Sequence, residues 1–200
     1  MNRRAFIISM SLALWAANAG AQSLADRFPG IPAPDGRGIE AYEAGFQDRA
    51  AALYGNADPA SRRDIEAMRA LLAAPRLAFN TSDDISGNWQ VRSGQVSPYA
   101  GTLYSWFKAT IRPEGKVHIL HKATGSQRKF GHLMQDGDAY FYLGRSYYSD
   151  ETPRAHSYFS GGNGEDDREE KGYLVKLGPG HLLMILEPLG GRGEILELKR

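Results

Sequence analysis

The sequence predicts a mainly β protein of the α+β class: a helical hairpin over residues 39–75, then an eight- or nine-stranded antiparallel meander over residues 86–200. Two periodicities predict this order. Apolar residues recur every three or four positions in the first region, and they alternate with polar residues in the second. Turn residues separate the alternating runs, so neighbouring strands pair in sequence. We expect the meander to close into a barrel or a strongly curved sheet, since closure removes exposed strand edges.

Each helix has its own apolar stripe and its own end signals. The first stripe contains Ile39, Tyr42, Phe46, Ala50 and Leu53, and Gly55 follows it. The second helix starts at Asp58-Pro59, where the carboxylate can cap free N–H groups and proline suits the first helical position. Its stripe contains Ile65, Met68, Leu71 and Leu72, and Pro75 ends it. The short connection predicts an antiparallel pair.

The predicted strands are short and follow one another closely. Their ranges are 87–93, 101–112, 116–122, 127–134, 139–143, 155–159, 173–177, 181–186 and 194–198. Asp136-Gly137 is a favoured tight-turn pair and predicts a hairpin between the fourth and fifth of these strands. The charged, glycine-rich stretch 161–170 predicts a loop.

Aromatic and basic residues on these strands are the candidate binding residues. They are Trp89, Trp106, Gln127, Arg128, Arg145 and Tyr147. Aromatic residues are common in barrel cores, but here they fall on both faces of the strands. We expect the helical hairpin to cover the second aromatic face, with a partner surface or a pocket as the alternatives.

Composition excludes several chemistries. The chain has no cysteine, which rules out disulfides, thiol catalysis and cysteine-ligated zinc. Its 24 basic and 23 acidic residues are scattered along the chain and give no support for nucleic-acid binding. No sequence motif indicates a catalytic residue, a metal ligand set or a cofactor.

The N-terminus has the layout of an export signal. A basic start with Arg3-Arg4 precedes an apolar run to Ala17, and Ala19-Gly20-Ala21 is a small-residue cleavage site. The apolar run is shorter than the ~20 residues that span a bilayer. We therefore expect residues 1–21 to be removed and the mature protein to be periplasmic or secreted, with no stable membrane anchor. The general secretory route is favoured, and the arginine pair keeps the twin-arginine route open. Residues 22–38 predict an irregular lead-in.

Five histidines and one acidic run are the candidate metal-binding residues of the sequence. His118 and His121 are three residues apart, so on a strand they face opposite sides. The run Glu165 to Glu170 offers oxygen ligands but no calcium-loop spacing, and the sequence leaves open whether it binds calcium.

Several segments together resemble a known family. They are Gly87-Asn88-Trp89, Tyr104-Ser105-Trp106-Phe107, Gly125-Ser126-Gln127-Arg128, Leu177-Gly178-Pro179-Gly180 and Ile195-Leu196-Glu197-Leu198. Their order is similar to that in domain-of-unknown-function family 4893, a family of small secreted bacterial proteins, over residues 35–200. The resemblance implies a periplasmic location and a shared fold but no activity. A weaker, architectural resemblance links Gly87-Asn88-Trp89 and Lys199-Arg200 to lipocalin-like barrels, in which a basic residue of the last strand covers the tryptophan of the first.

The sequence favours a non-catalytic periplasmic barrel that binds a small molecule or an envelope protein. One alternative is an envelope hydrolase with a site at the barrel mouth near Arg128, His132, His156 and Asp166. Another is a protease-inhibitor-like protein that uses residues 22–38 as an arm.

Overall fold

The computed structural model describes residues 23–31, 38–80, 82–164 and 166–200. The predicted signal segment 1–21 and the part 32–37 of the lead-in lie outside these residues. The helices are α1 (Leu24–Arg27), α2 (Gly38–Tyr54) and α3 (Pro59–Leu72), with a 3-10 turn η1 (Ser157–Ser160). The strands are β1 (Gly87–Val96), β2 (Gly101–Leu103), β3 (Phe107–Glu114), β4 (Val117–Lys122), β5 (Gln127–Asp136), β6 (Ala139–Tyr148), β7 (Glu169–Gly178), β8 (His181–Leu186) and β9 (Gly193–Lys199).

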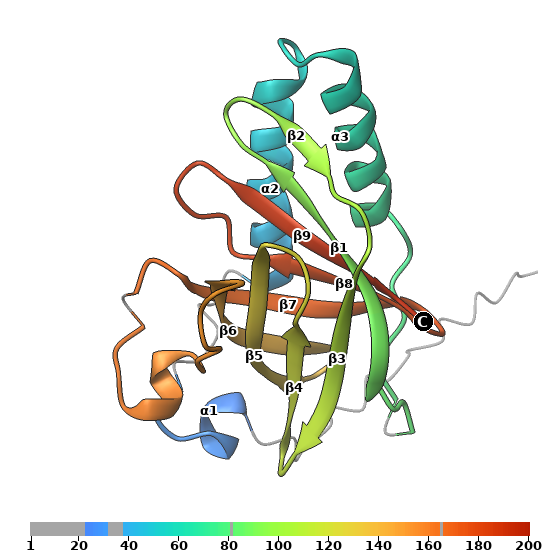
Figure 1. Cartoon of the computed structure of the whole chain (residues 1–200). Coiled ribbons are helices and arrows are strands. Elements are labelled where there is room, and N and C mark those ends of the chain that lie inside the picture. Colours follow the sequence, from blue (N-terminus) through green and yellow to red (C-terminus); the bar gives the residue numbers. More distant parts are fainter. Residues whose placement is uncertain (1–22, 32–37, 81, 165) are drawn as a thin grey trace, which may run out of the picture.

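Eight of the nine strands close into an antiparallel barrel, as predicted. Each strand from β3 to β9 pairs with the next, β1 pairs with β3, and β1 also pairs with β9. The short strand β2 lies outside the ring and extends β1 as a hairpin (Figure 1). The Asp136-Gly137 turn forms where expected, since Asp136 pairs with Ala139 and Gly137 has a φ of 57°.

Two of the predicted strands were wrong: one is divided in two, and the other does not form. The run 101–112 is divided into β2 and β3, because Tyr104–Trp106 leave the sheet to carry the chain from one pairing of β1 to the next. Residues 155–159 form no strand. His156 accepts a hydrogen bond from Tyr158 N and starts η1, and Ser157 N and Oγ donate to Glu169 of β7, so polar contacts take the place of strand pairing there.

The predicted helical hairpin covers one outer side of the barrel. α2 and α3 lie side by side next to β9, β1 and β2 (Figure 1). The stripe residues Tyr42, Phe46, Ala50 and Leu53 of α2 are buried against strand residues that include Phe141, Tyr173 and Ile185. Asp58 caps α3 by accepting from Ala60 N (2.8 Å) and Ser61 N (3.1 Å). No helix of the described residues is long and apolar enough to cross a membrane.

Close approach of α3 to the barrel depends on two glycines. A Cβ atom at Gly94 of β1 would lie 2.5 Å from Met68 Sδ, and one at Gly101 of β2 would lie 2.5 Å from Ile65 Cγ1. Met68 and Ile65 are both fully buried. The glycines thus set the distance at which the apolar stripe of α3 packs.

The barrel interior is filled by side chains. Inward-facing residues of all eight ring strands form one buried cluster, which contains Trp89, Val91, Ala109, Ile111, Leu120, Leu133, Tyr140, Tyr142, Leu174, Leu182, Met184, Leu186, Leu196 and Leu198. At one end, Phe79 packs edge-on against Tyr140, with ring centroids 4.9 Å apart. Neither of the two described pockets lies inside this cluster.

The other end of the interior is charged. Lys129 Nζ lies 2.5 Å from Glu170 Oε1 and 3.1 Å from Glu194 Oε2, on strands β5, β7 and β9. Burial disfavours the charged ammonium, but the two carboxylates outweigh it and the pKa of Lys129 is raised. Tyr142 Oη, Glu170 Oε2 and Glu194 Oε1 are buried there without a protein hydrogen-bond partner. The interior is therefore apolar at one end and ionic at the other.

Candidate functional site

A polar pocket of about 460 Å³ lies on the outer face of β6. The long connection from β6 to β7 folds back over the strand and forms its other walls. The lining residues are Arg145, Tyr147, Glu151, Thr152, Arg154, Asp166, Asp167 and Arg168. The walls thus carry three arginines and three carboxylates.

Strand alternation explains why β6 contributes Arg145 and Tyr147. Tyr140 and Tyr142 belong to the interior cluster, so the odd-numbered residues of β6 point outward. Arg145 pairs with Glu169 across β6 and β7, and Ser146 N donates to Arg168 O (3.0 Å). The sheet therefore holds the base of the pocket in register with the end of the connection.

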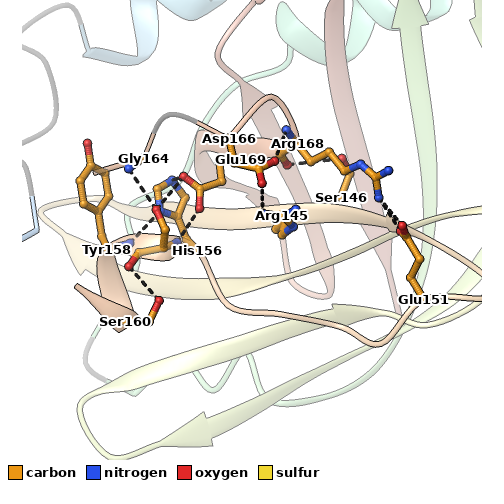
Figure 2. A network of polar contacts seen from close by, with 11 residues as sticks. Arg145, Ser146, Glu151, His156, Tyr158, Ser160, Gly164, Asp166, Arg168 and Glu169 are labelled. Carbon is orange, nitrogen blue, oxygen red and sulfur yellow. Dashed lines mark hydrogen bonds and ion pairs between the residues drawn. The ribbon is translucent and has the colours of Figure 1, made fainter. Parts of the chain in front are cut away.

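Two ion pairs fix the walls (Figure 2). Arg145 Nη1 lies 2.6 Å from Asp166 Oδ2, and Arg168 Nη1 lies 2.5 Å and 2.6 Å from the two oxygens of Glu151. The pKa of Asp166 is lowered mainly by the hydrogen bond from Arg168 N and, second, by the hydrogen bond from the Arg145 side chain. The pKa of Glu151 is lowered mainly by the hydrogen bond from the Arg168 side chain and, second, by the hydrogen bond from Tyr148 N. Both carboxylates stay ionised at neutral pH.

Arg154 differs from the other two arginines of the pocket. It is exposed, and it forms no ion pair with any other described residue. Because the described residues give Arg154 no carboxylate partner, its guanidinium is available to an anionic group of a ligand.

A buried cluster anchors the connection to β7 (Figure 2). Glu169 Oε1 accepts from Ser157 N (2.6 Å), and Glu169 Oε2 accepts from Ser157 Oγ (3.0 Å). Ser157 Oγ in turn accepts from Gly164 N (3.0 Å). His156 is fully buried, with Nε2 3.6 Å from Glu169 Oε2, and burial lowers its pKa. The serine hydroxyl faces the carboxylate and the loop backbone, so these contacts fasten the loop.

The structure brings three of the six predicted binding residues together. Arg145 and Tyr147 line the pocket, and Arg128 is the direct cross-strand partner of Tyr147. Tyr147 Oη lies 2.6 Å from His121 Nε2, which links β6 to β4. Arg128 also donates from Nε to Gly125 O (3.1 Å).

The other three lie elsewhere. Gln127 closes the ionic end of the barrel by accepting from Gln95 Nε2 (3.1 Å). Trp89 is 3% exposed inside the opposite end, where its Nε1 donates to Ile85 O (2.9 Å) and Arg200 covers its ring. Trp106 is 36% exposed on the outer surface.

The residues of the hydrolase hypothesis form no common site. Asp166 lines the pocket and pairs with Arg145, whereas His156 is enclosed by Glu169 and Tyr158. His132 stacks on Phe159, with ring centroids 3.7 Å apart, and burial lowers its pKa. Arg128 lies beside Tyr147.

The described part of the proposed inhibitor arm packs against the barrel. Leu24 of α1 is 3% exposed, and Arg27 donates from Nη2 to Gln135 O of β5. Ser23 and Asp26 form a capping box that starts α1, so this part of the lead-in is helical.

The acidic run is divided among different environments. Asp166 belongs to the pocket, Glu169 fastens the loop and Glu170 points to Lys129, while residue 165 lies outside the described residues. Within the described part of the chain, no group of three or more acidic, histidine or cysteine residues is placed to hold a metal ion.

The predicted binding residues do not include Glu151, Arg154 or Arg168, which also line the pocket. The only sequence signal was the density of charge between residues 151 and 170. The pairing of Arg145 with Asp166 joins a strand to a loop 21 positions later, and no local periodicity encodes such a contact.

These features define a class of protein: an eight-stranded antiparallel barrel with a helical hairpin on its outer side and a charged pocket under the connection from β6 to β7. Residues 33–192 match the family model described as a domain of unknown function (DUF4893), and the chain belongs to that family. No curated protein and no solved structure matches the chain, so the similarity to lipocalin-like barrels is not confirmed.

Proposed function

We propose that this protein is a non-catalytic exported barrel that binds its partner on its outer surface, in the pocket beside Arg145. The observation that carries the proposal is a pocket of about 460 Å³ whose charged walls are held in place by two ion pairs. Preorganised charged groups bind with little ordering cost. The filled interior argues against a small apolar ligand inside the barrel.

The chemistry of the walls indicates a polar, charged partner. Arg154 can take a carboxylate, and the exposed carboxylate of Asp167 can accept hydrogen bonds. An exposed segment of an envelope protein carries both kinds of group. We favour such a segment as the occupant.

Photo-crosslinking in intact cells tests this proposal. A photoreactive residue at Thr152, on the pocket wall, is expected to give a discrete crosslinked product that Arg154→Glu abolishes. The same residue at Lys116, in the exposed β3–β4 turn, is the control. Equal products at both positions, no product at Thr152, or a product unaffected by Arg154→Glu would each contradict the proposal.

The periplasmic location is part of the proposal and rests on residues 1–21. Cell fractionation of the full chain tests it. Replacing Arg3-Arg4 by Lys-Lys should leave export unchanged if the general secretory route is used, and should block it if the twin-arginine route is used. Retention of the unaltered chain in the cytoplasm would overturn the location.

A further inference from the structure

The outer face of β9, β1 and β3 carries an excess of positive charge, although the chain as a whole is nearly neutral. Gln90 of β1 pairs with Lys199 of β9 on one side and with Lys108 of β3 on the other. These three residues form one row across three strands, and all are exposed. Arg92 lies on the same face, two residues along β1.

The one carboxylate among these rows is already neutralised. Glu197 is the cross-strand partner of Arg92 and is 1% exposed. It accepts from Arg92 Nε (2.6 Å) and Lys199 Nζ (2.9 Å), and His181 Nε2 lies 2.8 Å away. Farther along β3, Arg112 and Glu114 carry opposite charges. The centre of the face is therefore left with more cations than anions.

The neutral residues of the face are polar or aromatic. Asn88 and Thr110 are cross-strand partners beside the row, and with Gln90 they present amide and hydroxyl groups. Trp106 lies next to the row, with Arg92 Cζ 4.7 Å and Lys199 Nζ 5.7 Å from its ring centroid. Trp106 is 36% exposed. We call Asn88, Gln90, Arg92, Trp106, Lys108, Thr110 and Lys199 the basic face.

We propose that the basic face binds an acidic polysaccharide. Carboxylates of the polymer would pair with Lys108 and Lys199, whose backbones are two strand spacings apart, about 10 Å. The amide and hydroxyl groups between the cations match sugar hydroxyls, and the partly exposed ring of Trp106 offers a flat surface to a sugar ring.

The composition of the basic face argues against a bilayer as the partner. No aliphatic side chain belongs to it, and the 36% exposed ring of Trp106 is the only apolar group it offers to a membrane. An acidic peptide also satisfies the cations, but it carries fewer hydroxyl groups than a polysaccharide to meet Asn88, Gln90 and Thr110. The basic face shares no residue with the pocket beside Arg145 on β6. An experiment can therefore contradict one of the two binding proposals without affecting the other.

Binding of the purified chain to polygalacturonate at low salt tests the proposal. We expect retention in an affinity gel that contains polygalacturonate and none with neutral dextran, and retention should fall as salt is raised. Lys108→Gln with Lys199→Gln should weaken binding about tenfold, since two exposed ion pairs are lost. Trp106→Ala should weaken it further without changing the salt dependence.

The control changes the same number of charges away from the basic face. Arg63→Gln with Lys116→Gln replaces two exposed cations on α3 and in the β3–β4 turn and should leave binding unchanged. Thermal unfolding of each variant reports whether the fold is intact. No retention of the wild type, an equal loss in the control, or binding of poly-glutamate as tight as that of polygalacturonate would overturn the proposal, the last in favour of an acidic peptide.

Discussion

Arg200 covers Trp89 at the apolar end of the barrel. The guanidinium carbon lies 4.6 Å from the ring centroid, and the two terminal nitrogens donate to Ser86 O (2.7 Å) and Asp84 O (2.6 Å). One side chain thus joins the end of β9 to the segment that enters β1. Trp89 itself fills the interior behind it.

Replacing Arg200 should destabilise the barrel without unfolding it. Arg200→Ala removes a cation–π contact and two hydrogen bonds to backbone oxygens, and we expect a loss of about 1–2 kcal/mol in the free energy of unfolding. Arg200→Lys should recover only part of this, because lysine cannot make both hydrogen bonds and stack. Urea unfolding followed by Trp fluorescence measures the effect. Equal stability of Arg200→Ala and the wild type would contradict the role given to this contact.

Glu169 should hold the connection that walls the pocket. Glu169→Ala leaves Ser157 N and Oγ without their acceptor in a partly buried site, which costs about 1–3 kcal/mol locally. We expect faster hydrogen exchange and faster proteolysis within residues 149–168, with little change in the barrel strands. Asp167→Asn, an exposed change in the same connection, is the control and should leave both rates unchanged. Uniform loosening of the whole barrel would show that Glu169 acts on the fold and not on the loop.

Lys129 should matter mainly as the partner of two carboxylates. Lys129→Met leaves Glu170 and Glu194 together at the ionic end without their shared cation, and we expect a loss of about 3–5 kcal/mol. Adding Glu170→Gln and Glu194→Gln should restore most of the stability, since the uncompensated charges are gone. Chemical denaturation of the single and triple variants gives both values. A triple variant as unstable as Lys129→Met would mean that the packing of the lysine side chain, and not its charge, sets the stability of this end of the barrel.

Lys122 should give the fold a distinct pH dependence. Burial, and next the charge of Lys129, lowers the pKa of Lys122 from 10.5 to about 8. Between these two values the unfolded chain binds more protons than the folded one, so the free energy of unfolding should rise as pH increases from about 8. Denaturation at several pH values between about 8 and 9 measures the slope, a range in which most tyrosine side chains are still protonated.

The Lys122 prediction has a matched control. Lys122→Met should abolish the rise, whereas Lys116→Met, at an exposed turn, should keep it. A rise of the same size in Lys122→Met would assign the slope to other groups.

Local patterns predicted most of the fold because the interactions behind them are local. The stripe Tyr42, Phe46, Ala50 and Leu53, the cap at Asp58 and the turn at Asp136-Gly137 each depend on residues within a few positions. The two strand errors fall where a partner distant in sequence decides the structure. Tyr104–Trp106 leave the sheet because β1 exchanges β2 for β3 as its neighbour, and residues 155–159 lose a strand to the anchor on Glu169.

The sequence by itself determined the order of helices and strands, the absence of cysteine chemistry and the family, because periodicity, composition and short motifs are readable along the chain. Tertiary structure alone decided which face each charge occupies. Barrel closure turned Glu170 inward to Lys129 and Glu169 outward to Ser157, although the two are neighbours in sequence. It also gathered Arg145, Arg154 and Arg168 around one pocket and placed Lys108 and Lys199 on either side of Gln90. Strand register brings together residues far apart in the chain, so no composition or local pattern could place these charges.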